Sequence, residues 1–207
     1  MSIETWLAFV AASAVLLIIP GPTILLVISY ALGRGLRAAL PVAVGVALGD
    51  FTAMTLSLLG LGALLATSAL LFTIFKWAGA AYLVWLGIGL WRAGAGLQVE
   101  GRKDEAPALS MLGHAWLVTA LNPKSITFFI AFLPQFIDPT VGFWKQMLIF
   151  ETTFLGLAFA NAIGYGLIAS RARGLVQNQR AIGIFNRVGG SLLIGAGLAA
   201  ASVRSVQ

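Results

Sequence analysis

The stretch from Trp6 to Leu32, WLAFVAASAVLLIIPGPTILLVISYAL, decides how this sequence folds. It contains no charged residue and is longer than the roughly 20 apolar residues that a helix needs to cross a bilayer. Near its centre, Pro20 and Pro22 remove backbone donors and Gly21 adds conformational freedom. The sequence therefore predicts a transmembrane helix that breaks in its middle.

Five further apolar runs follow along the chain. They extend approximately over residues 38–66, 70–90, 109–137, 143–170 and 182–203. Of the 207 residues, 59% are hydrophobic and 10% are charged, and the mean hydropathy is +0.96, as is typical of integral membrane proteins. Because the connections are too short to hold a soluble domain, we predict an all-α integral membrane protein with six transmembrane helices in a single domain, residues 1–207.

The positive charges lie mainly between the apolar runs. The net charge is +6, from 13 Lys and Arg against 7 Asp and Glu. The connections after the first, third and fifth runs hold Arg34, Arg37, Arg92, Arg102, Lys103, Arg171, Arg173, Arg180 and Arg187. Since cytoplasmic loops are enriched in Lys and Arg, we expect these connections in the cytoplasm and both termini outside. The basic balance then reflects topology, and no nucleic-acid partner is expected.

Several enzyme classes lack their usual residues here. The chain has no Cys and a single His, His114, which argues against thiol catalysis, thiolate metal sites and Ser-His chemistry. No glycine-rich phosphate loop precedes a Lys and a Ser or Thr, so nothing supports ATP coupling. We expect no enzymatic activity, no metal and no cofactor.

Two matches at one spacing suggest an internal repeat. Adding 101 to Pro22 gives Pro123, and adding 101 to Asp50 gives Glu151, the acidic residues well inside the predicted spans. In the third span of each half, Phe75, Gly79, Leu83 and Gly87 match Phe185, Gly189, Leu193 and Gly197 at a spacing of 110. The alternative is chance matching among Gly and Leu in apolar sequence.

These matches divide the chain into halves of three helices each, about residues 1–95 and 106–207, joined by a cytoplasmic linker. Because three is odd, the second half enters the membrane from the opposite face. The expected architecture is a 3+3 inverted-topology repeat, which is typical of secondary transporters.

The predicted helix breaks are candidate binding elements. Pro20, Gly21 and Pro22 interrupt the first span, and Asn122-Pro123-Lys124 occupies the corresponding place in the fourth. Half-helix N-termini attract carboxylates and half-helix C-termini attract cations, so two facing breaks are suited to a zwitterion. The alternative is that the prolines only shape helix packing.

Ionisable residues inside the spans are candidates for coupling. An isolated buried carboxylate costs several kcal/mol, on the order of what a charge costs in a bilayer, so Asp50 is expected to face an interior cavity and to exchange protons there. Lys124 is its expected partner, either for function or as a structural ion pair. Glu151, nearer the outer interface, is a second proton-coupling candidate or a solvated residue. Asn161 and Tyr165 are weaker candidates for lining a pathway, because interhelical hydrogen bonding is the commoner use of such residues.

The sequence also resembles the LysE/RhtB family of amino-acid exporters over nearly its whole length. The resemblance rests on Ile19-Pro20-Gly21-Pro22-Thr23, residues 33–39 (GRGLRAA), residues 44–50 (VGVALGD), residues 76–83 (KWAGAAYL), Leu121-Asn122-Pro123-Lys124 and residues 128–136 (FFIAFLPQF). It implies export of amino acids or similar metabolites across a bacterial inner membrane, driven by protons, with the two proline motifs in the transport site. The fifth span departs from the family pattern, because Ala158 to Asn161 replace acidic residues expected near its middle.

The leading interpretation is a proton-coupled exporter of amino acids that works by alternating access. Its expected partners are the lipid bilayer and, as a candidate assembly, a second copy of the chain in a homodimer. A passive small-solute or ion channel is the nearest alternative. A non-transport assembly subunit is a third interpretation, although buried charges and paired helix breaks are costly in a scaffold.

Overall fold

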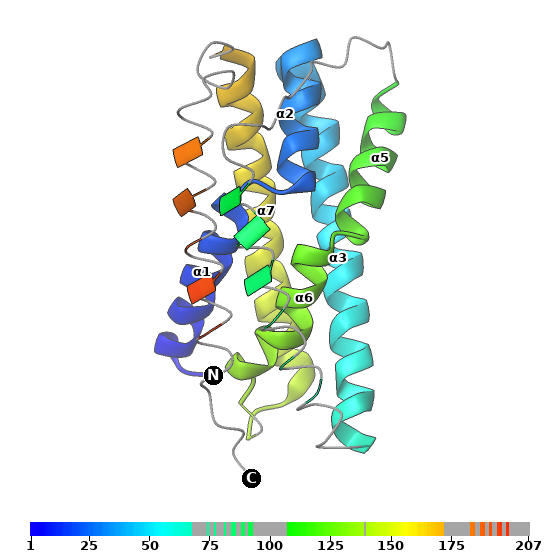
Figure 1. Ribbon diagram of the computed structural model, residues 1–207. Coiled ribbons are helices and arrows are strands. Elements are labelled where there is room, and N and C mark those ends of the chain that lie inside the picture. Colours follow the sequence, from blue (N-terminus) through cyan, green and yellow to red (C-terminus); the bar gives the residue numbers. More distant parts are fainter. Residues whose placement is uncertain are drawn as a thin grey trace.

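The computed structural model describes residues 1–67, 107–138 and 140–171, together with single positions between 74 and 92 and between 183 and 198. Within these residues the chain forms six α-helices and one short 3-10 helix, with no strand (Figure 1). The predicted all-α class is therefore confirmed. Only single positions of the third and sixth predicted spans are described, and the linker between the halves lies outside the described residues, so the six-span repeat stays a prediction.

The first predicted span consists of two helices. Helix α1 (Ile3–Ile18) begins at Ser2, whose hydroxyl accepts a hydrogen bond from the Thr5 amide, and α2 (Pro22–Arg34) begins directly after the N-cap Gly21. Proline is well suited to the first helical position, because its missing N–H would have no intrahelical partner there. The helices meet at 56°, so the predicted break in this span is confirmed.

The fourth predicted span is broken in the same way. Helix α5 (Ala108–Ala120) is followed by α6 (Pro123–Ala131) and the 3-10 helix η1 (Leu133–Phe136), with a bend of 46°. Asn122 caps α6 by accepting a hydrogen bond from the Lys124 amide at 3.0 Å. Each proline motif thus starts a new helix in the middle of its span.

Two long helices cross the bundle without a break. They are α3 (Leu36–Thr67) and α7 (Phe143–Arg171), and both are long and apolar enough to span a membrane, α3 over Leu36–Gly60. Counting each bent pair as one span gives up to four spans among the described residues. The chain turns from α2 into α3 at Gly35, whose φ of 66° favours glycine.

Corresponding helices of the two halves run in opposite directions. In Figure 1, α1 and α2 rise from the end of the bundle that holds the N-terminus, whereas α5 and α6 descend toward it. The long helices behave likewise, because α3 descends and α7 rises. This arrangement of four elements is what an inverted repeat requires.

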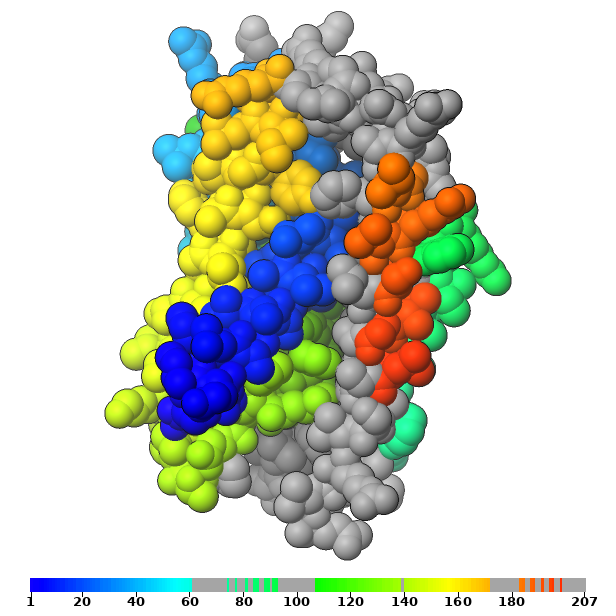
Figure 2. All heavy atoms as spheres, turned by 90° about the vertical axis from the view of Figure 1, so that its left-hand side faces the viewer, coloured from blue at the N-terminus to red at the C-terminus, as the bar shows by residue number. Residues whose placement is uncertain are grey.

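Two apolar cores lie on either side of the breaks. One, the aromatic core, consists of buried residues of α1, α3, α6, η1 and α7, and includes Phe9, Phe129, Phe150 and Phe154 with no exposed surface. Its rings pack closely, with centroids 4.6 Å apart for Phe9 and Phe150 and 4.9 Å for Phe129 and Phe154. The other joins α2, α3, α5 and α7 around small aliphatic residues such as Ala38, Val42, Ala115 and Ala162. Figure 2 shows α1 running diagonally between α7 and the α6–η1 segment on this face.

Glycines let α3 and α5 approach closely. A Cβ added at Gly49 would lie 2.6 Å from the Thr119 Cβ and 2.7 Å from the Trp116 carbonyl oxygen. One added at Gly45 would collide with the Leu112 carbonyl oxygen. The small-xxx-small pair of Gly45 and Gly49 therefore fixes α3 against α5, from Leu112 to its last turn.

A buried glutamine secures the connection from η1 to α7. Gln146, 1% exposed, accepts a hydrogen bond from the Asp138 amide and donates to the carbonyls of Asp138 and Val141. The Thr140 hydroxyl and amide both donate to the Asp138 carboxylate, which lowers the pKa of Asp138 below its usual value. These bonds define where α7 starts.

We expect Gly49→Ala to lower the free energy of unfolding in detergent by about 1–3 kcal/mol, because an extra methyl group overpacks the α3–α5 contact. Gly60→Ala on the same helix is the control, since a Cβ there meets nothing within 4 Å. Denaturant unfolding followed by tryptophan fluorescence measures both. Equal stability of the two variants would contradict the close contact.

Candidate functional site

The break in the first span leaves the C-terminal carbonyls of α1 without helical partners in the middle of the bundle. Such groups need a donor, because no bulk water reaches them in a bilayer. The Lys124 ammonium, on α6, donates to the carbonyl oxygens of Leu16 at 3.0 Å and Ile19 at 2.8 Å. Lys124 is only 6% exposed. Its positive charge thus lies at the negative end of the α1 dipole, where a cation is stabilised.

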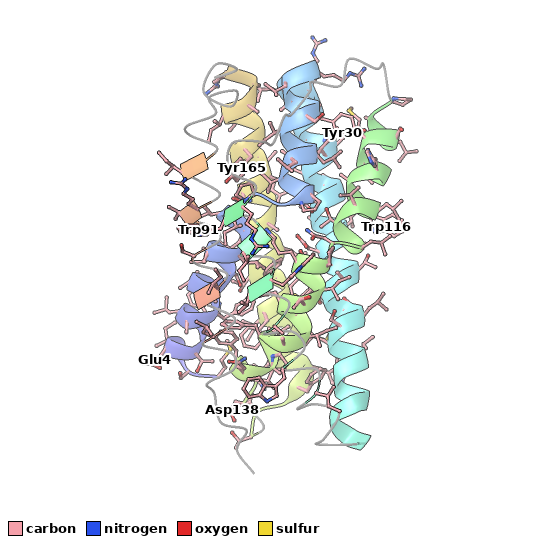
Figure 3. The ribbon with its side chains drawn as sticks, viewed as in Figure 1. Glu4, Tyr30, Trp91, Trp116, Asp138 and Tyr165 are labelled. Atoms are coloured by element: carbon pink, nitrogen blue, oxygen red, sulfur yellow. The ribbon has the colours of Figure 1, made fainter. Side chains whose placement is uncertain are left out.

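Two side chains of α7 complete the cap on α1. Asn161 donates its amide to the Leu17 carbonyl at 3.0 Å, and Tyr165 donates its hydroxyl to the Ile18 carbonyl at 2.6 Å. Figure 3 shows Tyr165 in the upper half of the bundle. Four consecutive carbonyls, from Leu16 to Ile19, therefore receive side-chain donors. Asn161 and Tyr165 serve here in interhelical hydrogen bonding, the alternative to lining a pathway.

A second polar network joins the two breaks. Asn122 donates its side-chain amide to the Thr23 hydroxyl at 3.0 Å, and the hydroxyls of Thr23 and Thr119 are 3.2 Å apart. All three residues are buried. The start of α2, the end of α5 and the start of α6 are thus tied together, and the two proline motifs form one site.

Gly21 leaves room for the lysine that crosses this site. A Cβ added at Gly21 would lie 3.4 Å from the Lys124 Nζ, 3.5 Å from its Cε and 3.7 Å from its Cδ. Within the described ranges, no side chain caps the N-terminus of α2. The first break therefore presents backbone amides of α2 beside the ammonium of Lys124.

Asp50 lies on α3 near the second break. Its neighbour Gly49 packs against the last turn of α5, and Asp50 itself is only 2% exposed. The Ser125 hydroxyl, in the first turn of α6, donates to the carboxylate, and the charge of Lys124 acts on it electrostatically. The oxygen Oδ1 has no hydrogen-bond partner within the described part of the chain. A buried carboxylate oxygen without a donor is available to a proton or to a cationic group.

Glu151 does not belong to this cluster. It is buried on α7 and accepts a hydrogen bond from the Thr55 hydroxyl at 2.5 Å, next to Phe150 of the aromatic core. Ten residues separate it from Asn161, or about 15 Å along a helix that rises 1.5 Å per residue. Glu151 thus lies toward the end of the bundle that holds the N-terminus.

The structure brings most of the predicted site residues together. Pro20, Gly21, Pro22, Asn122, Pro123, Lys124 and Asp50 meet around the breaks, and Asn161 and Tyr165 adjoin them. Lys124 differs from the prediction, because its hydrogen-bond partners are backbone carbonyls of α1.

The sequence reasoning missed Thr23, Thr119 and Ser125. Thr23 and Ser125 directly follow helix-starting residues of the two motifs, a position that points into the site, whereas nothing local marks Thr119. No group of three His, Cys, Asp or Glu that is suited to a metal occurs in the residues that the structure describes.

Paired broken spans, buried ionisable side chains at the breaks and two unbroken apolar helices define a helical membrane protein with a polar site in its interior. The family model for LysE type translocators matches residues 14–203. The chain belongs to the LysE type translocator family, as the resemblance predicted.

Relatives cover the chain almost completely. An uncharacterized membrane protein of Vibrio cholerae is 36% identical over 205 residues, 99% of this chain and 100% of that protein. The homoserine/homoserine lactone efflux protein of Salmonella typhimurium is 34% identical over 97% of this chain and 98% of its own. The leucine efflux protein of Klebsiella pneumoniae is 31% identical over 70% of this chain and 72% of its own. No solved structure matches the chain.

We expect Lys124→Met to lower the free energy of unfolding by about 3–5 kcal/mol, because it removes a buried charge and leaves two carbonyls without donors. Asn161→Leu, which removes one hydrogen bond, is expected to cost about 1–3 kcal/mol. The control is Lys145→Met, since Lys145 is exposed at the start of α7. If Lys124→Met unfolds like this control in detergent, Lys124 does not cap α1.

Proposed function

We propose that the chain is a secondary transporter that exports amino acids or related small metabolites from the cytoplasm by proton-coupled alternating access. The observation that carries this proposal is the Oδ1 of Asp50, which is buried beside two broken helices and has no hydrogen-bond partner in the part of the chain that the structure describes. Burying such an oxygen costs free energy with no structural return, which is the pattern of a site that awaits a ligand or a proton.

The site offers opposite charges to a zwitterion. The substrate ammonium binds Oδ1 of Asp50, and the substrate carboxylate binds the N-terminus of α2, where no side chain of the described residues caps the backbone amides. The hydroxyls of Thr23 and Ser125 lie in the first turns of α2 and α6 and hydrogen-bond to Asn122, Thr119 and Asp50, which holds these polar groups in place around the substrate.

Competition at Asp50 couples the export of substrate to the entry of protons. A proton and the substrate ammonium cannot both occupy Oδ1, so the carboxyl leaves the cytoplasmic side with substrate and returns from outside with a proton. The two halves, a 3+3 inverted repeat of six spans, rock about this site. On the outer side, the aromatic core closes the passage, and Glu151 receives protons on their way to Asp50.

The charge distribution supports the orientation that export needs. Arg34 ends α2, Arg37 lies in the first turn of α3 and Arg171 ends α7, all at one end of the bundle (Figure 1). Glu4 and Asp138 lie at the other end (Figure 3). By the positive-inside rule the first end faces the cytoplasm of a bacterial inner membrane, and the termini face outward.

We expect Asp50→Asn to abolish accumulation of labelled leucine or homoserine in inside-out vesicles that have an acidic lumen, because the amide cannot exchange a proton. Thr52→Val on the same helix is the control, since the Thr52 hydroxyl faces the Leu48 carbonyl and Trp116 and not the site. Size-exclusion chromatography verifies folding. Undiminished accumulation by Asp50→Asn would mean that another residue couples transport to protons.

Glu151→Gln is expected to lower the maximal rate of this uptake several-fold and to leave the apparent affinity for the substrate unchanged, because Glu151 lies away from the breaks. The measurement is initial uptake over a range of substrate concentrations at a fixed pH gradient. A weaker affinity at an unchanged maximal rate would assign Glu151 to substrate binding instead.

A further inference from the structure

The contacts pair Asp50 with Asn161 across the repeat. Asp50 follows Gly49, which packs against the last turn of α5, and Asn161 donates to the Leu17 carbonyl in the last turn of α1. Asp50 therefore lies on α3 beside the end of α5, and Asn161 lies on α7 beside the end of α1. The two positions differ by 111 residues, close to the spacing of 110 found for the third span of each half.

The local sequences agree with this pairing. Residues 45–50 read GVALGD and residues 156–161 read GLAFAN, so a small-xxx-small pair precedes the polar residue in both. Asn161 is thus a second candidate counterpart of Asp50, beside Glu151 at a spacing of 101. Part of the difference between the spacing of 101 for the prolines and 111 for Asp50 and Asn161 arises because Gly35 alone joins α2 to α3, whereas residues 137–142 join η1 to α7.

Position 161 carries an amide where position 50 carries a carboxylate, and this difference determines the charge of the site. Among the described residues at the breaks, the buried ionic side chains are the Asp50 carboxylate and the Lys124 ammonium. Asn161 and Tyr165 add hydrogen bonds and no charge. The formal charge of the protein around the breaks is thus zero before a substrate enters.

We propose that Asn161 restricts this transporter to amino acids with no net charge. A zwitterion leaves the balance at zero, whereas lysine or arginine adds a buried positive charge that nothing at the breaks compensates. A carboxylate at position 161 would lie near Lys124, because both side chains reach the same turn of α1. This carboxylate would neutralise Lys124, so that the negative charge of Asp50 balances the extra positive charge of a lysine or arginine substrate.

The inference rests on the proposed export function, and the experiment separates the two. Purified wild type and Asn161→Asp are reconstituted in liposomes, and uptake of labelled leucine and lysine is driven by a pH gradient. Wild type is expected to prefer leucine at least tenfold, and Asn161→Asp to raise the ratio of lysine to leucine uptake at least tenfold. Asn161→Leu is the control, since it loses the hydrogen bond to Leu17 without adding charge, and it is expected to keep the wild-type ratio.

Equal uptake of leucine and lysine by wild type would overturn the inference and leave export intact. This measurement uses wild-type protein alone, so it does not depend on whether a variant folds. A folded Asn161→Asp protein with the wild-type ratio would overturn it as well. A changed ratio in Asn161→Leu would assign the effect to the lost hydrogen bond and not to charge. No uptake of any amino acid by wild type would overturn the proposed function itself.

Discussion

The cap that Lys124 places on the end of α1 is the interaction on which the rest of this structure depends. A helix broken inside a membrane exposes carbonyls that bulk water cannot reach, so the chain must supply donors from elsewhere. Here an ammonium from α6 and two neutral donors from α7 take that role. Because these donors come from the second half of the chain, the break in the first half also holds the halves together.

The same requirement produces a site at the second break. There the flanking long helix contributes Asp50, an acceptor, where α7 contributes the donor Asn161. The α1 side of the first break is therefore capped by the protein's own groups, while Asp50 near the second break keeps a carboxylate oxygen with no hydrogen-bond partner among the described residues. In a member of the LysE type translocator family, a buried acceptor of this kind is a candidate binding group for the cargo.

Much of the site was predictable from sequence, since the signals are chemically rare. Two prolines around a glycine in an apolar run, a second proline motif 101 residues later and a carboxylate inside a span each have few explanations. The register of α7 against α3 could not be read from sequence, because Asp50 has two candidate counterparts, Glu151 at a spacing of 101 and Asn161 at a spacing of 111. The partners of Lys124 were also hidden, since backbone carbonyls carry no sequence signal.

The most direct test of the central claim is whether wild-type protein in liposomes moves an amino acid against its own concentration gradient when only a pH gradient is imposed. Proton-coupled export predicts accumulation of labelled leucine above equilibrium, and its loss once an ionophore collapses the pH gradient. Flux that stops at equal concentrations, with or without the gradient, would contradict coupled export and indicate a passive channel.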